Sequence, residues 1–228
     1  MTRITEQLGR LQRRINSAAE PAGRDPGSVR ILAVSKRQPI EALVAAHAAG
    51  LRHFGENYLQ EALDKIAVMD NDAVWHFIGP IQSNKTRSIA ANFDWVHTVT
   101  SPRIVERLSA QRPSDHEDLQ VCIQLRPHNA NNRNGVTEDD LPGLAAMIAE
   151  APQLHLRGLM TIPLPDRGAA DTRQEFARAR RLLDELGRAG YAVDTLSMGM
   201  SADLEAAIIE GSTCIRIGTD LFGTRDYG

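Results

Sequence analysis

The sequence predicts an α/β protein in which eight parallel strands close into a barrel, with one extra helix at the amino-terminal end. Short apolar runs alternate with longer segments of helical spacing along the whole chain, and eight such runs can be counted. The chain has 228 residues, a length that suits one (β/α)8 domain. An open doubly wound sheet shares this alternation and stays an alternative on the pattern alone.

The elements follow from local residue patterns. Apolar side chains recur at helical spacing from Ile4 to Ile15, which predicts a leading helix that ends near Pro21. Strands are expected at residues 29–34, 53–55, 74–78, 95–99, 119–125, 154–159, 196–198 and 214–217. Helices are expected between them at residues 39–49, 58–68, 84–91, 102–110, 137–150, 171–188 and 202–210, with Thr137 as one N-cap. This alternation favours a TIM barrel with an extra N-terminal helix, and residues 1–228 are expected to form one barrel domain.

Composition and charge point to an ordinary water-soluble chain. Apolar residues make up 42% and charged residues 24%, and the net charge is −3, so a nucleic-acid or membrane partner is not expected. Residues 1–20 lack the apolar core of a signal peptide, and no run approaches the ~20 apolar residues of a membrane-spanning helix. Cys122 and Cys214 stand in separate apolar runs, which predicts buried thiols and a reducing, cytoplasmic setting.

Small and polar residues follow the strands, at the end of the barrel where this fold class places its functional groups. Lys36 comes directly after the apolar stretch that ends at Val34, so its amine is expected at the barrel mouth. Partial desolvation lowers the pKa of an ammonium and frees the amine for Schiff-base chemistry. The competing interpretation is a solvated lysine at a strand end. Lys65 and Lys85 lie in helical patterns and are interpreted as surface charges.

Two glycine-containing segments predict an anion site. Met200 and Ser201 follow the seventh strand in a turn that is expected to open a helix, and Gly218 and Thr219 follow the eighth strand. Free N–H groups at a helix start favour anions, and barrels often hold a phosphate between these two loops. Ser201 is also interpreted as an N-cap, and both roles are compatible.

Three further polar residues allow two interpretations each. Arg216 lies in an otherwise apolar strand, where a guanidinium needs partners, so it either joins a structural ion pair or faces a ligand. Asn57 either hydrogen-bonds a ligand or serves as a turn asparagine. His76 is interpreted as a hydrogen-bonded strand histidine rather than a metal ligand or a base. No metal-ligand or serine–histidine–carboxylate spacing stands out.

Several ordered motifs resemble the pyridoxal phosphate homeostasis protein family, the pyridoxal 5′-phosphate (PLP) binding proteins related to the N-terminal barrel of alanine racemase. The motifs are Ala-Val-Ser-Lys at 33–36, His-Phe-Gly-Glu-Asn-Tyr at 53–58, Trp-His-Phe-Ile-Gly-Pro-Ile-Gln-Ser-Asn-Lys at 75–85, Arg-Gly-Leu-Met at 157–160, Leu-Ser-Met-Gly-Met-Ser at 196–201 and Arg-Ile-Gly-Thr at 216–219. The match runs nearly end to end, so a single PLP-binding barrel domain is expected.

The resemblance implies that PLP is bound as a Schiff base on Lys36, with its phosphate between the last two loops. Arg216 is expected by the ring nitrogen, where it keeps that nitrogen unprotonated and weakens the electron sink. The expected cofactor-binding residues are Lys36, Asn57, Met200, Ser201, Arg216, Gly218 and Thr219. Some relatives carry a lysine in the loop before Gly135, where this chain has Arg133 and Asn134, so a second PLP-accepting lysine is not expected there.

The resemblance implies a non-catalytic PLP-binding protein that maintains vitamin B6 homeostasis and can deliver PLP to apo-enzymes. The open mouth of the barrel is compatible with a monomer, which is the expected state. An amino-acid racemase of the alanine racemase type is the alternative, but it needs a tyrosine from a C-terminal β-domain of the partner subunit. Because the sequence stops at Gly228, that domain is expected to be missing, and none of Tyr58, Tyr191 and Tyr227 is placed for the role. A PLP-free phosphosugar barrel would leave Lys36 and Arg216 unexplained.

Overall fold

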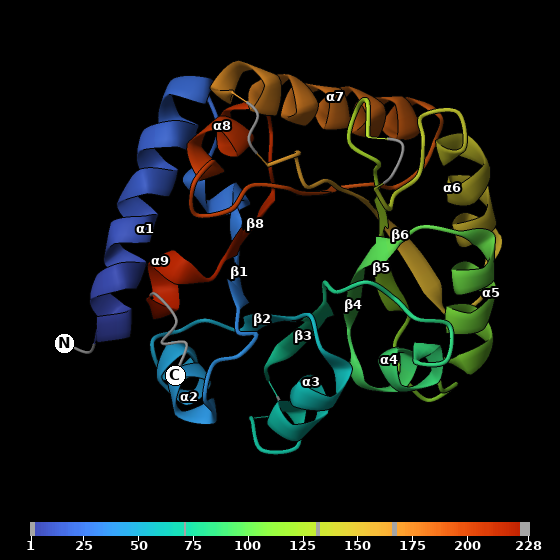
Figure 1. Cartoon of the computed structure of the whole chain (residues 1–228), viewed down its shortest axis with the longest axis horizontal. Coiled ribbons are helices and arrows are strands. Elements are labelled where there is room, and N and C mark those ends of the chain that lie inside the picture. Colours follow the sequence, from blue (N-terminus) through green and yellow to red (C-terminus); the bar gives the residue numbers. More distant parts are fainter. Residues whose placement is uncertain (1–2, 71, 131–132, 166–167, 224–228) are drawn as a thin grey trace.

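In the computed structural model, eight parallel strands close into one barrel that helices surround (Figure 1). The structure describes residues 3–70, 72–130, 133–165 and 168–223. The strands are β1 (Arg30–Val34), β2 (His53–Glu56), β3 (Val74–Phe77), β4 (Trp95–Val99), β5 (Leu119–Gln124), β6 (Leu154–Met160), β7 (Thr195–Ser197) and β8 (Cys214–Ile217). Because β1 pairs with β8, the predicted TIM barrel is confirmed and the open doubly wound sheet is wrong.

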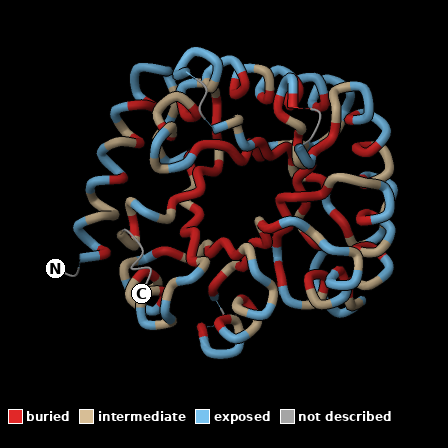
Figure 2. The backbone as a smooth tube through the Cα atoms, viewed as in Figure 1, coloured by how far each residue is buried: buried red, intermediate tan, exposed pale blue. Residues whose placement is uncertain are grey.

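Helices cover the outside of the barrel and bury their apolar sides against the strands (Figure 2). They are α1 (Arg3–Ala19), α2 (Ile40–Ala48), α3 (Leu59–Ile66), α4 (Thr86–Asn92), α5 (Pro102–Gln111), α6 (Leu141–Glu150), α7 (Ala169–Arg188), α8 (Leu204–Ile209) and α9 (Thr219–Phe222). Within the described part of the chain, none of these helices is long and apolar enough to cross a membrane.

The leading helix α1 confirms the predicted extra element and has a definite place in the barrel. It buries Ile4, Leu11 and Ile15 and packs against α8 and α9, the last helices of the described chain (Figure 1). Arg24, just after α1, donates hydrogen bonds to the carbonyls of Ile208 and Ser212. The first and last parts of the chain are therefore joined by helix packing as well as by the β1–β8 pairing.

The inside of the barrel is more polar than is usual for the fold, where branched aliphatic side chains dominate. A small cluster of Trp95, Cys122 and Met160 is separate from the main hydrophobic core. His97 on β4 hydrogen-bonds Ser197 on β7, and since these strands are not neighbours, the bond crosses the barrel interior. Both cysteines are buried free thiols, as predicted.

Two predicted helix starts are wrong. The helix predicted from Thr137 begins at Leu141 instead, since Pro142 has no N–H to donate and fits only the first turn of a helix. Thr137 accepts a hydrogen bond from the Asp140 N–H at 3.2 Å and so holds a turn before the helix. Ser201 is not the N-cap of α8, whose N-cap is Asp203.

Candidate functional site

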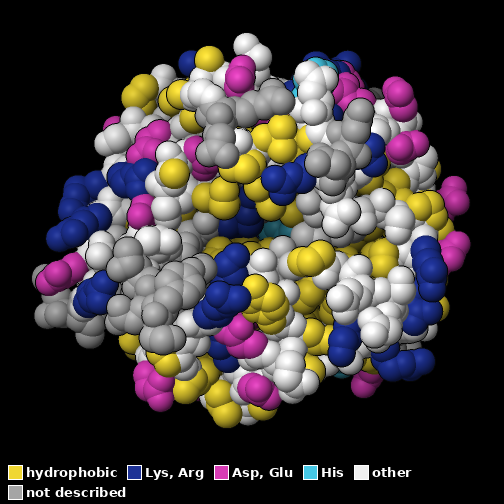
Figure 3. All heavy atoms as spheres, viewed as in Figure 1, with side chains coloured by type: hydrophobic (Ala, Val, Ile, Leu, Met, Phe, Trp, Pro, Cys, Tyr) yellow, Lys and Arg dark blue, Asp and Glu magenta, His cyan; other side chains and the backbone are white. Residues whose placement is uncertain are grey.

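A cavity of about 280 Å³ opens at the carboxyl ends of the strands. Figure 3 shows this end of the barrel, hollowed at its centre, with basic side chains at the edge of the hollow and a histidine deeper inside. Its lining residues are Val34, Lys36, Asn57, Ile78, Met160, Ile162, Met200, Ser201, Ala202, Arg216, Gly218 and Thr219. All seven residues that the sequence analysis singled out are in this set, so the fold brings together side chains from the exits of β1, β2, β7 and β8.

The backbone on both sides of Lys36 is held by charged side chains. The Ser35 hydroxyl donates to Glu56 Oε1 at 2.7 Å, and Lys65 Nζ donates to the Ser35 carbonyl at 2.7 Å. On the other side, the Arg37 N–H donates to Glu61, and Arg37 adopts a left-handed φ of 59°. These contacts fix where Lys36 leaves β1 and enters the cavity.

Lys65 corrects the sequence prediction of a surface charge, because it is buried. Its ammonium lies 2.7 Å from Glu56 Oε1 and 2.6 Å from Glu61 Oε1. Burial raises the pKa of Glu56, while the hydrogen bonds from Lys65 and Ser35 act in the opposite direction. Lys85, the other lysine interpreted as a surface charge, is exposed as predicted.

Arg216 is buried and held by oxygen atoms of the barrel. Its Nη1 donates to the Ser197 carbonyl at 2.6 Å and to the Ser197 hydroxyl at 2.9 Å, and its Nη2 donates to the Thr161 carbonyl at 2.9 Å. Among the described residues no carboxylate forms an ion pair with it, so the structural ion pair considered from the sequence is not what holds it. Burial lowers the pKa of this guanidinium. The side chain reaches the cavity already oriented.

Three histidines continue the polar network from Arg216 through the barrel. The His97 ring is 2.8 Å from the Ser197 hydroxyl and 2.8 Å from the His76 ring, which is in turn 2.9 Å from the His53 ring. Burial lowers the pKa of His97 to about 3 and that of His53 to about 4, and holds the pKa of His76 well below its ordinary value. His76 is thus a hydrogen-bonded strand histidine, as predicted.

Asn57 presents a buried acceptor that lacks a partner within the described chain. Its Oδ1 is buried and receives no hydrogen bond there. The Asn57 backbone is also tightly placed, because a Cβ at Gly79 would lie only 2.1 Å from the Asn57 carbonyl oxygen. An unsatisfied buried amide oxygen is costly, so this atom is suited to accept a hydrogen bond from a ligand.

The segments after β7 and β8 lie side by side at the cavity. The Ser201 hydroxyl accepts a hydrogen bond from the Asp220 N–H at 3.4 Å, which connects the two segments directly. Gly199 adopts a φ of +92°, and a Cβ there would lie 2.6 Å from the Ala207 side chain. The hydroxyls of Ser201 and Thr219, with the backbone of Gly218, are the groups these loops bring to the cavity.

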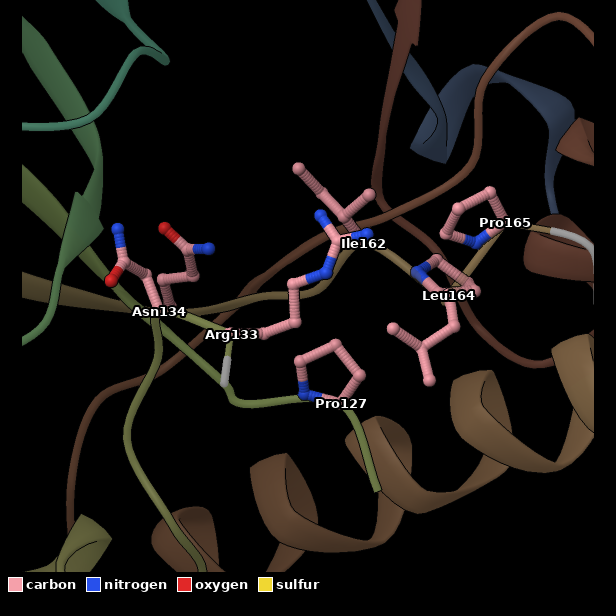
Figure 4. A pocket seen from close by; sticks show the side chains of 8 residues that line it. Pro127, Arg133, Asn134, Ile162, Leu164 and Pro165 are labelled. Carbon is pink, nitrogen blue, oxygen red and sulfur yellow. The ribbon is translucent and has the colours of Figure 1, made fainter. Parts of the chain in front are cut away.

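A second cavity of about 400 Å³ adjoins the first, and Ile162 lines both. Figure 4 shows that Arg133 and Asn134 come from the loop after β5 and that the Arg133 side chain points toward Ile162. The sequence of this loop, residues 129–135, contains no lysine, and a guanidinium does not form a stable imine with an aldehyde as a lysine amine does. That no second PLP site lies in this loop stays a prediction. In the described parts of the chain, no cluster of three or more metal-ligating side chains was found.

Sequence reasoning missed several residues that shape the site. Glu56 had a visible signal, since it is a carboxylate at the end of β2, next to Asn57. Arg14, Lys65 and His97 had none, because each lies in an ordinary helix or strand pattern and reaches its partners only through the fold.

The barrel fold and the lysine at its mouth define a class of proteins, and a comparison of the sequence with protein-family models identifies that class. Residues 7–226 match the model of the alanine racemase N-terminal domain, so the chain belongs to that family. A pyridoxal phosphate homeostasis protein from Pseudomonas aeruginosa is 54% identical over 100% of this chain and 98% of its own length. One from Escherichia coli K12 is 45% identical over 100% and 99%. Within its class, the chain belongs to the pyridoxal phosphate homeostasis protein family.

Solved structures agree with this placement. PipY of Synechococcus elongatus, solved with PLP bound, is 37% identical and superposes with a TM-score of 0.85 over 97% of this chain and 100% of its own. Alanine racemase from Corynebacterium glutamicum is 19% identical with a TM-score of 0.69, covering 95% of this chain and 61% of its own. The likeness to the racemase shows a shared barrel fold alone.

Proposed function

We propose that this chain binds PLP as a Schiff base on Lys36 and maintains vitamin B6 homeostasis without catalysing a reaction of its own. One observation carries the proposal: a single cavity gathers Lys36, the buried guanidinium of Arg216, the unsatisfied Asn57 Oδ1 and the hydroxyls of two adjacent loops. The relatives named for PLP homeostasis and the PLP-bound PipY structure support it.

The residues present fit this cofactor. PLP supplies an aldehyde that condenses with a lysine amine, and it carries a phosphate and a ring hydroxyl. Lys36 would supply the amine, and Ser201, Gly218 and Thr219 would bind the phosphate, with Met200 beside them. Asn57 Oδ1 would accept a hydrogen bond from a polar ring substituent, which removes the cost of its missing partner. A cavity of about 280 Å³ lies near the lower end of the range for small-molecule sites, about 300–1,000 Å³.

Arg216 would limit the electron withdrawal by a bound PLP, a property shared with those catalytic PLP sites that also place an arginine at the ring nitrogen. A permanently charged guanidinium beside a ring nitrogen disfavours protonation of that nitrogen, and so reduces the electron withdrawal on which PLP catalysis depends. The hydrogen bonds to Ser197 and Thr161 hold Arg216 in place, so this influence would be constant. The chain's contribution would be to bind and orient the cofactor.

The cavity lining argues against a racemase. Racemisation with two bases needs a second acid–base group opposite the lysine. Among the described residues, the lining contains no tyrosine, histidine, cysteine or carboxylate. Tyr58 is exposed and lies near Arg37, and Tyr227 lies outside the described residues.

We infer that the protein also delivers PLP to apo-enzymes, and that it does so as a monomer in the cytoplasm.

Borohydride trapping tests the proposal. Purified protein incubated with PLP and reduced with borohydride is expected to carry the label on the peptide that contains Lys36, because reduction makes the carbon–nitrogen bond permanent. Lys36→Ala should lose all covalent label after denaturation, while retaining weak, phosphate-driven binding that dialysis reverses. The matched control is Lys85→Ala, an exposed lysine that should label like wild type. Equal covalent retention by Lys36→Ala and wild type would refute the proposal.

A further inference from the structure

One side chain of the leading helix connects the two loops that follow β7 and β8. Arg14 on α1 forms a two-pronged ion pair with Glu205, with Nε 2.6 Å from Oε1 and Nη2 2.9 Å from Oε2. The same Nη2 donates to the Ser201 carbonyl at 2.9 Å, and Nη1 donates to Asp220. All three guanidinium nitrogens of Arg14 are therefore bound to these two segments.

The partners of Arg14 belong to the segments that line the cavity. Ser201 lines it directly, and Asp220 follows Thr219, which also lines it. The Asp220 N–H donates to the Ser201 hydroxyl, so the two loops touch where Arg14 binds both. The helix α1 lies alongside α8 and α9 (Figure 1), and Arg14 reaches the Ser201 carbonyl from this helix. Its guanidinium thus approaches the loops from the outside of the barrel.

Arg14 also changes the charge of this end of the cavity. Glu205 in the first turn of α8 and Asp220 in α9 bring two carboxylates next to the loops that would hold an anionic phosphate, and Asp203, whose carboxylate accepts from the Met200 N–H, adds a third. Like charges close together are unfavourable, and an ion pair with a guanidinium cancels much of this effect. The hydrogen bond from Arg14 lowers the pKa of Glu205, which keeps this carboxylate charged and paired.

We propose that Arg14 is a positioning residue for the phosphate of the cofactor. It holds the loops after β7 and β8 together in the arrangement that a phosphate requires, and its positive charge offsets part of the negative charge that Glu205 and Asp220 bring next to that phosphate. This inference rests on the proposed binding of PLP. It assigns a role in the site to a residue of the amino-terminal helix that is itself outside the cavity lining.

The test compares two ligands that differ only in the phosphate. PLP carries it and pyridoxal does not, while both offer an aldehyde to Lys36. For Arg14→Gln, the dissociation constant for PLP is expected to rise about tenfold, whereas that for pyridoxal should change less than about twofold. Both constants can be measured from the absorbance of the bound ligand. The loss should arise mainly as faster dissociation of PLP, because a loosened pair of loops releases the phosphate sooner.

Two further variants make the outcome decisive. Arg173→Gln breaks an ion pair to Glu210 at the other end of α8 and should leave both constants unchanged. Arg14→Lys keeps the charge but not the two-pronged geometry, and should give an intermediate loss for PLP; it also replaces Arg14→Gln if that variant does not fold. Equal losses for both ligands, or no loss for PLP, would overturn the role of Arg14. If wild-type protein bound neither ligand at Lys36, the proposed function itself would fail.

Discussion

At the scale of single residues, Lys65 is a charged residue that is buried next to the backbone of Lys36. Its ammonium lies between Glu56 and Glu61 and also binds the carbonyl of Ser35, the residue before Lys36. Glu56 Oε2 has no hydrogen-bond partner among the described residues, so this carboxylate depends on the contacts of its other oxygen. The cluster stabilises the native backbone around Lys36 only while all its charges are present.

Lys65→Met is therefore expected to be strongly destabilising. Removing the cation leaves Glu56 buried beside Glu61 without compensation, which should lower the free energy of unfolding by about 3–5 kcal/mol. Lys85→Met, at an exposed site, should change it by no more than about 0.5 kcal/mol. Urea unfolding monitored by circular dichroism measures both values. A loss below about 1 kcal/mol for Lys65→Met would show that the cluster does not depend on its cation.

At the scale of elements, the site depends on how closely the exits of neighbouring strands approach each other. Gly79 follows β3, and Asn57 follows β2, the strand paired with it. A Cβ at Gly79 would lie 2.1 Å from the Asn57 carbonyl oxygen and 2.9 Å from its Cα, which no side chain can occupy without moving the backbone. The absence of a side chain at Gly79 thus allows Asn57 to reach the cavity.

Gly79→Ala is expected to displace Asn57 and to weaken PLP binding as well as the fold. Because the added methyl group meets backbone rather than a flexible side chain, the free energy of unfolding should fall by about 1–3 kcal/mol. Gly143→Ala is the matched control, since Gly143 lies in α6 with open space around it and should be stabilised by about 0.5–1 kcal/mol. Thermal unfolding and PLP titration of both variants measure these effects. Wild-type PLP affinity in Gly79→Ala would contradict this account.

At the scale of the whole molecule, a polar chain runs through the interior of the barrel. It begins at Arg216 beside the cavity and passes through Ser197 and His97 to His76 and His53. Trp95 stacks against His76 at 5.3 Å, while the Arg30 guanidinium lies 5.3 Å from the Trp95 ring. With Arg216 at one end and Arg30 near the other, further positive charge on the histidines is disfavoured.

The native barrel is accordingly expected to lose stability in mild acid. The unfolded chain binds protons on its histidines as the pH falls below about 6.5, whereas native His97 stays neutral down to about 3. Since the unfolded state binds more protons in this window, its free energy falls relative to the native state, by about 1.4 kcal/mol per pH unit for each fully buried histidine. His53 contributes in the same way down to a pH of about 4, the value to which burial lowers its pKa.

Denaturant unfolding between pH 7 and pH 5 measures this effect, in a range above the ordinary pKa values of carboxylates. His97→Gln removes one of the buried titrating groups, so its stability should depend less steeply on pH than that of wild type, even if it is less stable throughout. A wild-type stability that stays constant from pH 6.5 to 5 would show that the histidines are not neutral in the native barrel.

The sequence by itself determined the order of strands and helices and where polar groups would gather. Both follow from short stretches of sequence, because apolar residues repeat with the period of each helix or strand. Parallel strands bring their carboxyl ends to one end of the barrel, so the strand pattern alone predicts that Lys36 and Arg216 lie near each other. Predicted boundaries differed by a few residues where a side chain held a turn, as Thr137 does before α6.

Only the tertiary structure decided which distant residues support that site. Lys65 in a helical pattern looks like any surface lysine, and its burial depends on Glu56, which another element contributes. Arg14 is separated from Glu205 by 191 residues, and His97 reaches Ser197 across the barrel. Local periodicity reports which side of an element is buried, but not which partner it meets there, because the partner is set by closing the barrel and docking α1 on its last helices.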